Sequence, residues 1–217
     1  MQHRLTLLAG AAAFAISAAA FAADTYTIDS RHTFPVFEVN HLGFSTQRGR
    51  FNKTTGTVTL DTAARQGSVE VVIDTASIDM SLEDWDKHMK NEDFFNVEKY
   101  PSMTFKSDRF VFKKGKPAEI HGTLTLLGVE KPVKLAVNHF HCGVHPINKK
   151  EVCGADLTTR IKRSDFGMTK FLPAVGDDVF IRIPVEAFKD EPPQPGPSAA
   201  VAPPLGWAVA GRTEAER

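Results

Sequence analysis

Apolar and polar residues alternate through most of the chain, and this pattern limits the fold more than any other feature of the sequence. In the segment SVEVVID, for example, Val69, Val71 and Ile73 share one face of an extended strand. Successive side chains of a β-strand point to opposite faces of a sheet. Each such segment therefore predicts a strand with one apolar face and one solvated face.

About eight alternating segments follow one another, from residues 24–28 to residues 179–188, with short turns between them. No strand–helix–strand rhythm is present, so the pattern indicates an antiparallel sheet that runs up and down or closes on itself. Eight strands that close into a barrel leave room for side chains and one small ligand. The sequence thus predicts an all-β, eight-stranded antiparallel barrel.

The apolar phase of these strands is expected to face the inside of the barrel and to form the wall of a ligand cavity. Bulky Phe side chains suit such a wall because they carry no polar tip that needs a partner. The predicted cavity residues are Phe37, Val39, Val58, Val71, Ile73, Phe94, Phe95, Met103, Phe105, Leu124, Leu126, Leu135, Val137, Ile181 and Ile183.

One segment departs from the alternation and predicts a short helical cap over residues 81–95. Ser81 followed three residues later by Asp84 resembles a helix entry, and apolar residues then recur at helical spacing in SLEDWDKHM. Phe94 and Phe95 end the segment and are expected to close one end of the barrel. They are either core plugs or a lid that contacts a ligand. The nearby acidic residues are expected to form the solvated face of the cap.

Both ends of the chain differ in composition from the predicted barrel, which is assigned to residues 23–189. Residues 1–22 have a basic start, an apolar Ala-rich run and an Ala-x-Ala ending, which predicts a cleaved secretory signal. A membrane anchor is the alternative, but no basic stop-transfer cluster follows the apolar run. Residues 190–217 are rich in Pro, Ala and Gly and predict a disordered tail, in which Trp207 is a candidate docking point.

The charge balance gives no sign of nucleic-acid binding, and the two cysteines are expected to pair if the chain is exported. The 26 basic and 26 acidic residues balance, and no basic stripe is present. The only two cysteines, Cys142 and Cys153, flank a turn-rich segment. In an oxidising compartment such a pair normally forms a disulfide, which is worth about 2.5–3 kcal/mol for a loop of this size.

No recognisable catalytic motif is present, because the sequence contains neither a GxSxG elbow nor a phosphate-binding glycine loop. His139 and His141 are two residues apart and would share one face of a strand. With His145 they are candidates for a Zn or Cu site, although the cavity rim is the preferred place for them.

Other polar residues are expected at the rim of the cavity. His41, Arg163 and Asp165 occupy strand-to-loop positions. Arg163 and Asp165 are expected to pair and fix the long irregular connection that follows. Alternatively, Arg163 joins other basic residues in a site for an anionic head group, since Arg suits phosphate. These other basic candidates are Arg48, Arg50 and Lys162.

Several segments in register resemble the YceI family of exported bacterial proteins, also called polyisoprenoid-binding or YceI-like domain proteins. They cover nearly all of residues 24–188. The matching segments are YTIDSRHTFPVFEVNHLGFSTQRGRF, SVEVVIDTASIDM, DKHMKNEDFFNVEKYPSMTFKS, HGTLTLLGVEKPVKL, and RSDFGM followed by VGDDV and VEAF. Pro35 and Asn40 depart from the family pattern, and Asn40 replaces a basic residue that commonly precedes His-Leu-Gly.

The resemblance implies a lipocalin-like barrel that is periplasmic, has no enzymatic activity or cofactor, and binds a long isoprenoid chain such as a polyprenyl phosphate or a quinone-like lipid. Partners expected besides the lipid are an inner-membrane protein and, if the protein is not a monomer, a second copy in a homodimer. Three alternatives are a quinone-handling redox partner of a membrane cytochrome, a metal binder that uses the His cluster, and a filled barrel that serves as a binding module.

Overall fold

Strands make up most of the chain in the computed structural model, which describes residues 23–191. The predicted signal sequence (1–22) lies outside the described residues, as does the predicted tail apart from residues 190 and 191. The elements in chain order are β1 (Asp24–Ile28), β2 (Val36–His41), β3 (Ser45–Phe51), β4 (Thr54–Asp61), β5 (Gln66–Asp74), η1 (Thr75–Ser77), β6 (Ile78–Asp79), α1 (Glu83–Lys90), β7 (Ser102–Lys113), β8 (Lys116–Leu126), β9 (Val129–Val144), β10 (Glu151–Lys162), η2 (Arg163–Phe166) and β11 (Val175–Lys189).

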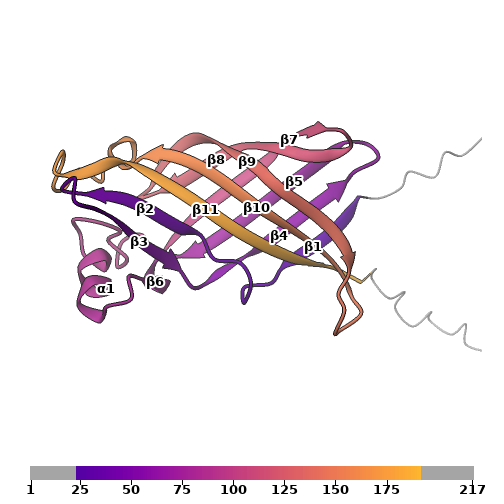
Figure 1. Ribbon diagram of the computed structural model, residues 1–217, viewed down its shortest axis with the longest axis horizontal. Helices are drawn as coiled ribbons and strands as arrows, with labels where there is room; N and C mark the ends of the chain where they lie inside the picture. Colours follow the sequence, from indigo (N-terminus) through magenta and orange to yellow (C-terminus); the bar gives the residue numbers. More distant parts are fainter. Residues whose placement is uncertain (1–22, 192–217) are drawn as a thin grey trace, which may run out of the picture.

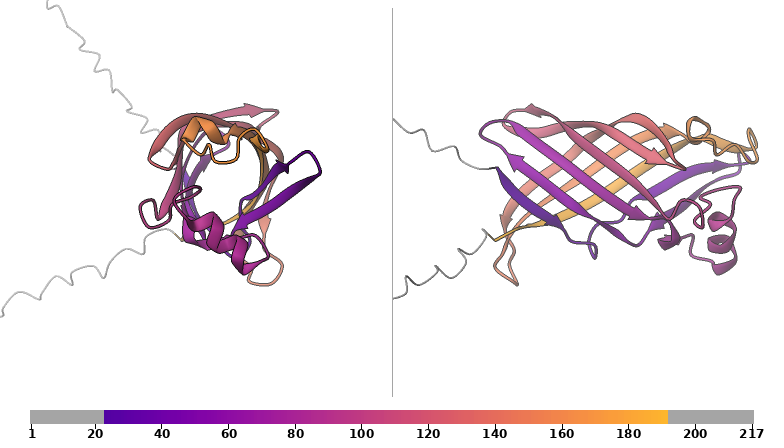
Figure 2. Two further views of the ribbon diagram at one scale, coloured as in Figure 1. Left: turned by 90° about the vertical axis from the view of Figure 1, so that its left-hand side faces the viewer. Right: turned by 180° about the vertical axis from the view of Figure 1, so that it is seen from behind.

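Eight of these strands form a closed antiparallel ring, which confirms the predicted barrel. The ring runs through β1, β4, β5, β7, β8, β9, β10 and β11. It closes because β11 also pairs with β1, with Tyr26 opposite Lys189 and Ile28 opposite Ala187. The end view shows the strands surrounding a central space (Figure 2). Closure removes the unpaired edges of the ring and turns alternate side chains inward.

Strand β11 is shared between two partners, so the two ends of the barrel differ. Its last residues pair with β1, whereas Val175 and residues 179–182 pair with β2. Strand β2 continues into β3, and β3 pairs at its end with the short β6. The β2–β3 hairpin therefore extends the wall at the end of the barrel that lies away from both termini (Figure 1).

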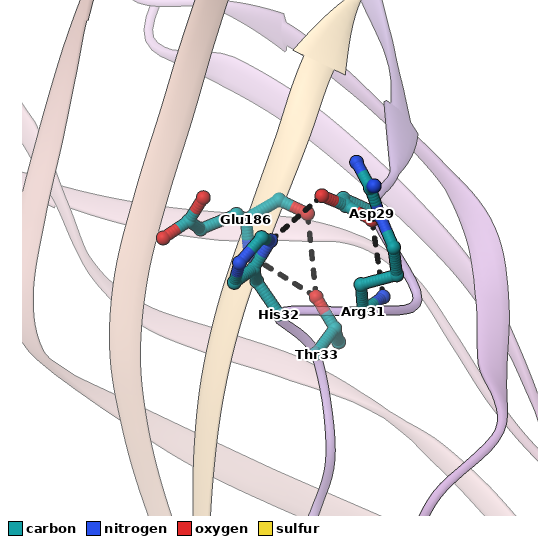
Figure 3. A network of polar contacts seen from close by, with 5 residues as sticks. All are labelled: Asp29, Arg31, His32, Thr33 and Glu186. Atoms are coloured by element: carbon teal, nitrogen blue, oxygen red, sulfur yellow. Dashed lines mark hydrogen bonds and ion pairs between the residues drawn. The ribbon is translucent and has the colours of Figure 1, made fainter. Parts of the chain in front are cut away.

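The crossover from β1 to β2 is held against β11 by a polar network (Figure 3). The Thr33 hydroxyl accepts from the Glu186 backbone N–H at 3.1 Å and donates to the Glu186 carbonyl at 3.3 Å. Asp29 contacts His32 at 2.8 Å and Arg31 at 3.3 Å. Burial acts to raise the pKa of the Asp29 carboxyl, but the hydrogen bonds from these two residues outweigh it and leave the pKa below its ordinary value.

The β9–β10 hairpin is closed by the expected disulfide. Cys142 and Cys153 are bonded, lie directly opposite one another in the two strands, and have Cα atoms 4.0 Å apart. The β9–β10 turn lies at the end of the barrel where β1 begins and β11 ends (Figure 1). It fixes the register of a hairpin that projects beyond the ring.

The cap contains a helix, but its start differs from the prediction. Helix α1 covers eight residues, and its N-cap is Leu82, which makes no side-chain capping bond. Ser81 has a left-handed backbone (φ 66°), and its N–H donates to the Asp79 carboxylate. The Asp86 carboxylate accepts from the Met80 N–H. The acidic side chains of Asp79 and Asp86 therefore order the segment before α1, and the Ser81 hydroxyl does not. Within residues 23–191, no helix has the length and apolar character required to cross a membrane.

Thr33 and Thr54 give a matched test of the crossover, because both are only 1% exposed. Thr33→Val removes the hydroxyl that pairs with Glu186, so we expect the free energy of unfolding to fall by about 1–3 kcal/mol. The Thr54 hydroxyl has no hydrogen-bond partner among the described residues. Thr54→Val should therefore leave stability unchanged or raise it. Urea unfolding measures both; an equal loss in the two variants would contradict a structural role for the Thr33 bonds.

Candidate functional site

The inside of the barrel contains a cavity of about 600 Å³. Its wall is formed mainly by Val, Ile, Leu, Met and Phe side chains from the strands of the ring. The structure places every residue of the predicted lining on this wall, and contact of these residues with a ligand remains a prediction. These residues are Phe37, Val39, Val58, Val71, Ile73, Phe94, Phe95, Met103, Phe105, Leu124, Leu126, Leu135, Val137, Ile181 and Ile183.

Phe94 and Phe95 close one side of the cavity at the end of the barrel that carries α1, which we call the cap end. Each is 7% exposed and lines the cavity. The Phe95 ring meets the Phe51 ring edge-on, with centroids 5.1 Å apart. The Phe94 ring lies 4.8 Å from His88 on α1 and 6.2 Å from Phe171 in the loop before β11. The pair is therefore both part of the core and part of the cavity surface.

A salt bridge and aromatic contacts join the cap to the η2–β11 loop. Lys170 Nζ lies 3.1 Å from Asp93, the residue directly before the two phenylalanines. The Phe171 ring lies 6.3 Å from His88 and contacts the cavity. The cap and the loop thus form one rim around the open end of the cavity.

The sequence pattern misses several residues that line the cavity. Asp84, Trp85, His88 and Met89 of α1 contribute to its lining at the open end. Their spacing of one, three and four residues is the signature of one helix face, and it could have identified them. Phe171 lies in an irregular segment, where neither the strand period nor the helix period assigns a face.

Arg163 is buried and organises the loop before β11. It is 4% exposed, and its guanidinium donates to the carbonyl oxygens of Gly176, Met168, Lys170 and Val175 at 2.8–3.0 Å. Burial lowers the pKa of the guanidinium, and a nearby carboxylate at the start of β11 opposes that shift. Its side chain reaches the cavity wall, but four of its five N–H donors are already bonded to backbone carbonyls.

The expected pair between Arg163 and Asp165 does not form. Asp165 is exposed and does not line the cavity. The carboxylate near Arg163 is that of Asp177, which accepts from the Ser164 N–H at 2.9 Å and from its hydroxyl at 2.8 Å. The Ser164 N–H is the main reason why the pKa of the Asp177 carboxyl lies below its ordinary value. The prediction was correct that Arg163 fixes this loop, but wrong about the partner.

The prediction that His139 and His141 line the cavity or its rim is wrong. Both are exposed on the outer face of β9, whereas Phe140 between them lines the cavity. The register explains the reversal: Val137 lies opposite Leu157, but His139 lies opposite the adjacent Asp156. Asn138 is therefore a β-bulge residue, and it moves the following side chains to the opposite faces. Within residues 23–191, no three His, Cys, Asp or Glu side chains are arranged to hold a metal ion.

His41 lines the cavity near its open end, as predicted, but the other basic residues proposed for an anionic head group have acidic partners. Arg48 pairs with Glu38 at 3.2 Å, and Arg50 pairs with Asp79 at 3.2 Å. Lys162 is exposed and lies near two carboxylates at the start of β11. These side chains do not converge on the cavity, since none of the three belongs to its lining.

Comparison with known proteins links this barrel to a described family. A family model named YceI-like domain matches residues 26–187. A UPF0312 protein of Vibrio cholerae is 39% identical over 171 residues, which cover 77% of this chain and 89% of that protein. A Pseudomonas aeruginosa UPF0312 protein is 35% identical over 192 residues, which cover 87% of this chain and 99% of that protein.

Solved structures share the same architecture. The Campylobacter jejuni YceI protein has 31% sequence identity and a TM-score of 0.58, over 70% of this chain and 90% of that chain. Burkholderia cenocepacia BcnA has 24% identity and a TM-score of 0.64, over 73% and 98% of the two chains. A polyisoprenoid binding domain from Saccharophagus degradans has 16% identity and a TM-score of 0.56, over 76% and 98%.

Replacement of Arg163 tests its structural role in this rim. Arg163→Met leaves four backbone carbonyls without their donor, so we expect the free energy of unfolding to fall by about 3 kcal/mol. Lys162→Met is the matched control, because it removes only exposed ion pairs and should cost less than about 1 kcal/mol. Urea unfolding of both variants provides the measurement.

A third variant, Asp165→Asn, separates the two accounts of Arg163. Asp165 is exposed and has no role in the observed network, so the variant should unfold like the unmodified protein. A loss in Asp165→Asn as large as that in Arg163→Met would restore the pairing expected from the sequence. Such a result would contradict anchoring through the backbone carbonyls.

Proposed function

Because this chain belongs to the YceI-like domain family, as the match over residues 26–187 establishes, we propose that it binds a long-chain isoprenoid lipid inside its barrel. The ligand is a polyprenyl phosphate or a quinone-like lipid. The protein carries or sequesters this lipid in the periplasm and catalyses no reaction on it. Exchange with an inner-membrane protein is part of the same proposal.

The observation that carries this proposal is the apolar cavity. Its volume of about 600 Å³ lies within the range of about 300–1,000 Å³ typical of ligand pockets. Removal of apolar surface from water contributes about 25 cal/mol per Å². A long hydrocarbon chain would gain most from such a wall, whereas a polar ligand would lose hydrogen bonds to water without replacement. A barrel filled by its own side chains would have no space of this size.

The polar groups of the lining support binding rather than catalysis. Thr33 and Arg163 are already hydrogen-bonded to backbone groups of β11 and its preceding loop. His41, Asp84 and His88 line the cavity near its open end, and the structure shows no hydrogen bond between any two of these three described side chains. A nucleophile and a base held within hydrogen-bond distance are the usual sign of covalent catalysis.

Three further observations support the ligand class and the compartment. The Saccharophagus degradans domain with the same fold is described as a polyisoprenoid binding domain. The disulfide between Cys142 and Cys153 is typical of proteins that reside in an oxidising compartment such as the periplasm. The Ala-rich N-terminal sequence over residues 1–22 has the composition of an export signal.

Adjacent residues of β5 give a matched test of lipid binding. Val71 lines the cavity, whereas Val72 is 39% exposed on the outer face. Val71→Trp places a large ring in the space that the lipid would occupy, so we expect lipid occupancy to fall at least tenfold. Val72→Trp should retain the occupancy of the unmodified protein. Native mass spectrometry after purification without detergent measures the bound fraction.

Two results would contradict the proposed function. One is a homogeneous ligand-free mass for the unmodified protein, together with no uptake of an added polyprenyl lipid. The other is equal occupancy in the Val71 and Val72 variants, since a lipid that binds elsewhere would not respond to the cavity. Circular dichroism confirms that both variants remain folded.

A further inference from the structure

The cap end of the barrel carries an unusual group of exposed apolar side chains. They come from three separate segments: the β2–β3 turn, the start of α1 and the η2–β11 loop. All three segments lie at the end opposite the termini (Figure 1). We call this group the apolar rim; its members and their exposed fractions are Leu42 (49%), Phe44 (90%), Leu82 (55%), Trp85 (41%) and Phe171 (49%).

Contacts between the segments make the apolar rim one surface. The Leu42 N–H donates to the Ala174 carbonyl at 2.9 Å, which joins the β2–β3 turn to the η2–β11 loop. The Phe171 ring lies 6.3 Å from His88, which joins that loop to α1. The view along the barrel axis shows the hairpin, the helix and the loop arranged around its opening (Figure 2).

The β2–β3 turn presents Phe44 to solvent on an ordered backbone. The Phe44 N–H donates to the His41 carbonyl at 3.0 Å, and the Gly43 N–H donates to the Asn40 side chain at 2.9 Å. Leu42 and Gly43 both adopt left-handed backbone conformations, with φ of 57° and 76°. Because Phe44 is 90% exposed, its side chain contributes nothing to the core. An exposed aromatic side chain on an ordered turn favours contact with a partner outside the protein.

The apolar rim continues directly into the cavity. Trp85 and Phe171 belong both to the exposed rim and to the cavity lining. An apolar path therefore leads from the surface to the interior without crossing a polar barrier at these residues. A partner that covered the rim would also cover the entrance through which a lipid must pass.

Charges near the apolar rim do not favour a strongly charged partner. Helix α1 carries both signs of charge, because its first turn is acidic and its last turn is basic. Lys170 pairs with Asp93 at 3.1 Å and lies 5.5 Å from the centre of the Phe171 ring. A surface of mixed charge around aromatic side chains suits the interface of a neutral bilayer, where Trp and other aromatic residues are enriched.

We propose that the apolar rim docks on the surface of a zwitterionic lipid bilayer and opens the cavity to its hydrocarbon region. Phe44 and Phe171 enter the interface between head groups and acyl chains. The isoprenoid chain then moves between bilayer and barrel without exposure to water. This inference rests on the proposed function and adds to it the site and the surface at which the lipid is exchanged.

Vesicle flotation of the purified protein tests the docking surface. Phosphatidylcholine vesicles should carry the unmodified protein to the top of a density gradient. Phe44→Ser should reduce the partition coefficient by about tenfold or more, because it removes a fully exposed aromatic side chain. Ile147→Ser is the matched control, because Ile147 is 85% exposed in the turn between β9 and β10, which lies at the opposite end of the barrel. The Ile147→Ser protein should bind vesicles as the unmodified protein does.

Several outcomes would overturn the docking inference. These are failure of the unmodified protein to bind vesicles, an equal loss in both variants, or binding only to phosphatidylglycerol vesicles with loss in high salt. The inference would also be overturned if Phe44→Ser converted a dimer to a monomer and left vesicle binding unchanged. That result would show that the apolar rim contacts a second copy of the chain.

Lipid uptake from detergent solution separates this inference from the proposed function. Phe44 does not line the cavity, so Phe44→Ser should take up polyprenol from micelles as the unmodified protein does, but should receive it from vesicles at least tenfold more slowly. If the unmodified protein takes up no polyprenol from micelles, the proposed function fails. If both proteins take it up equally well from vesicles, only the docking inference fails.

Discussion

The pairing of β1 with β11 is the contact on which the rest of the structure depends. Only three residue pairs form it, yet it converts an open sheet into a ring. Lys189 strengthens the seam through ion pairs with Asp24 at 2.9 Å and Glu151 at 3.0 Å, so that it contacts both neighbouring strands. These hydrogen bonds to the two carboxylates raise the pKa of the Lys189 ammonium group. Once the ring is closed, every alternate side chain must point into a shared interior.

The period-two pattern therefore predicted the wall of the cavity well, because the apolar face of each strand in a closed ring must face the interior to avoid water. It failed where the backbone departs from a regular strand. The bulge at Asn138 adds one residue to β9 and brings Phe140, rather than His139 or His141, to the cavity. Counting residues cannot detect such an insertion, since it becomes visible only when the partner strand defines the register.

The rim of the cavity was less predictable than its wall, because long-range contacts determine it. Arg163 was expected to bind a nearby carboxylate, but it reaches four carbonyl oxygens, two in an irregular loop without a periodic pattern and two at the start of β11. Phe171 belongs to that loop and meets α1 across the opening of the barrel. Both roles depend on the path of this loop. That path is determined by contacts with residues distant in the chain, which a single sequence does not reveal.

The division of β11 between β1 and β2 explains why the two ends of the barrel have different uses. Where β11 meets β1, the seam is tied by ion pairs and the disulfide-bonded hairpin lies nearby. Where β11 meets β2, the wall continues into a hairpin whose turn carries exposed Phe44. Between these two regions, the β1–β2 crossover is attached to β11 by hydrogen bonds between the Thr33 side chain and the Glu186 backbone, and not by strand pairing. The β1–β11 pairing thus completes the ring at one end of the barrel, and the cap and loops form the rim at the other end, where we propose that the lipid is exchanged.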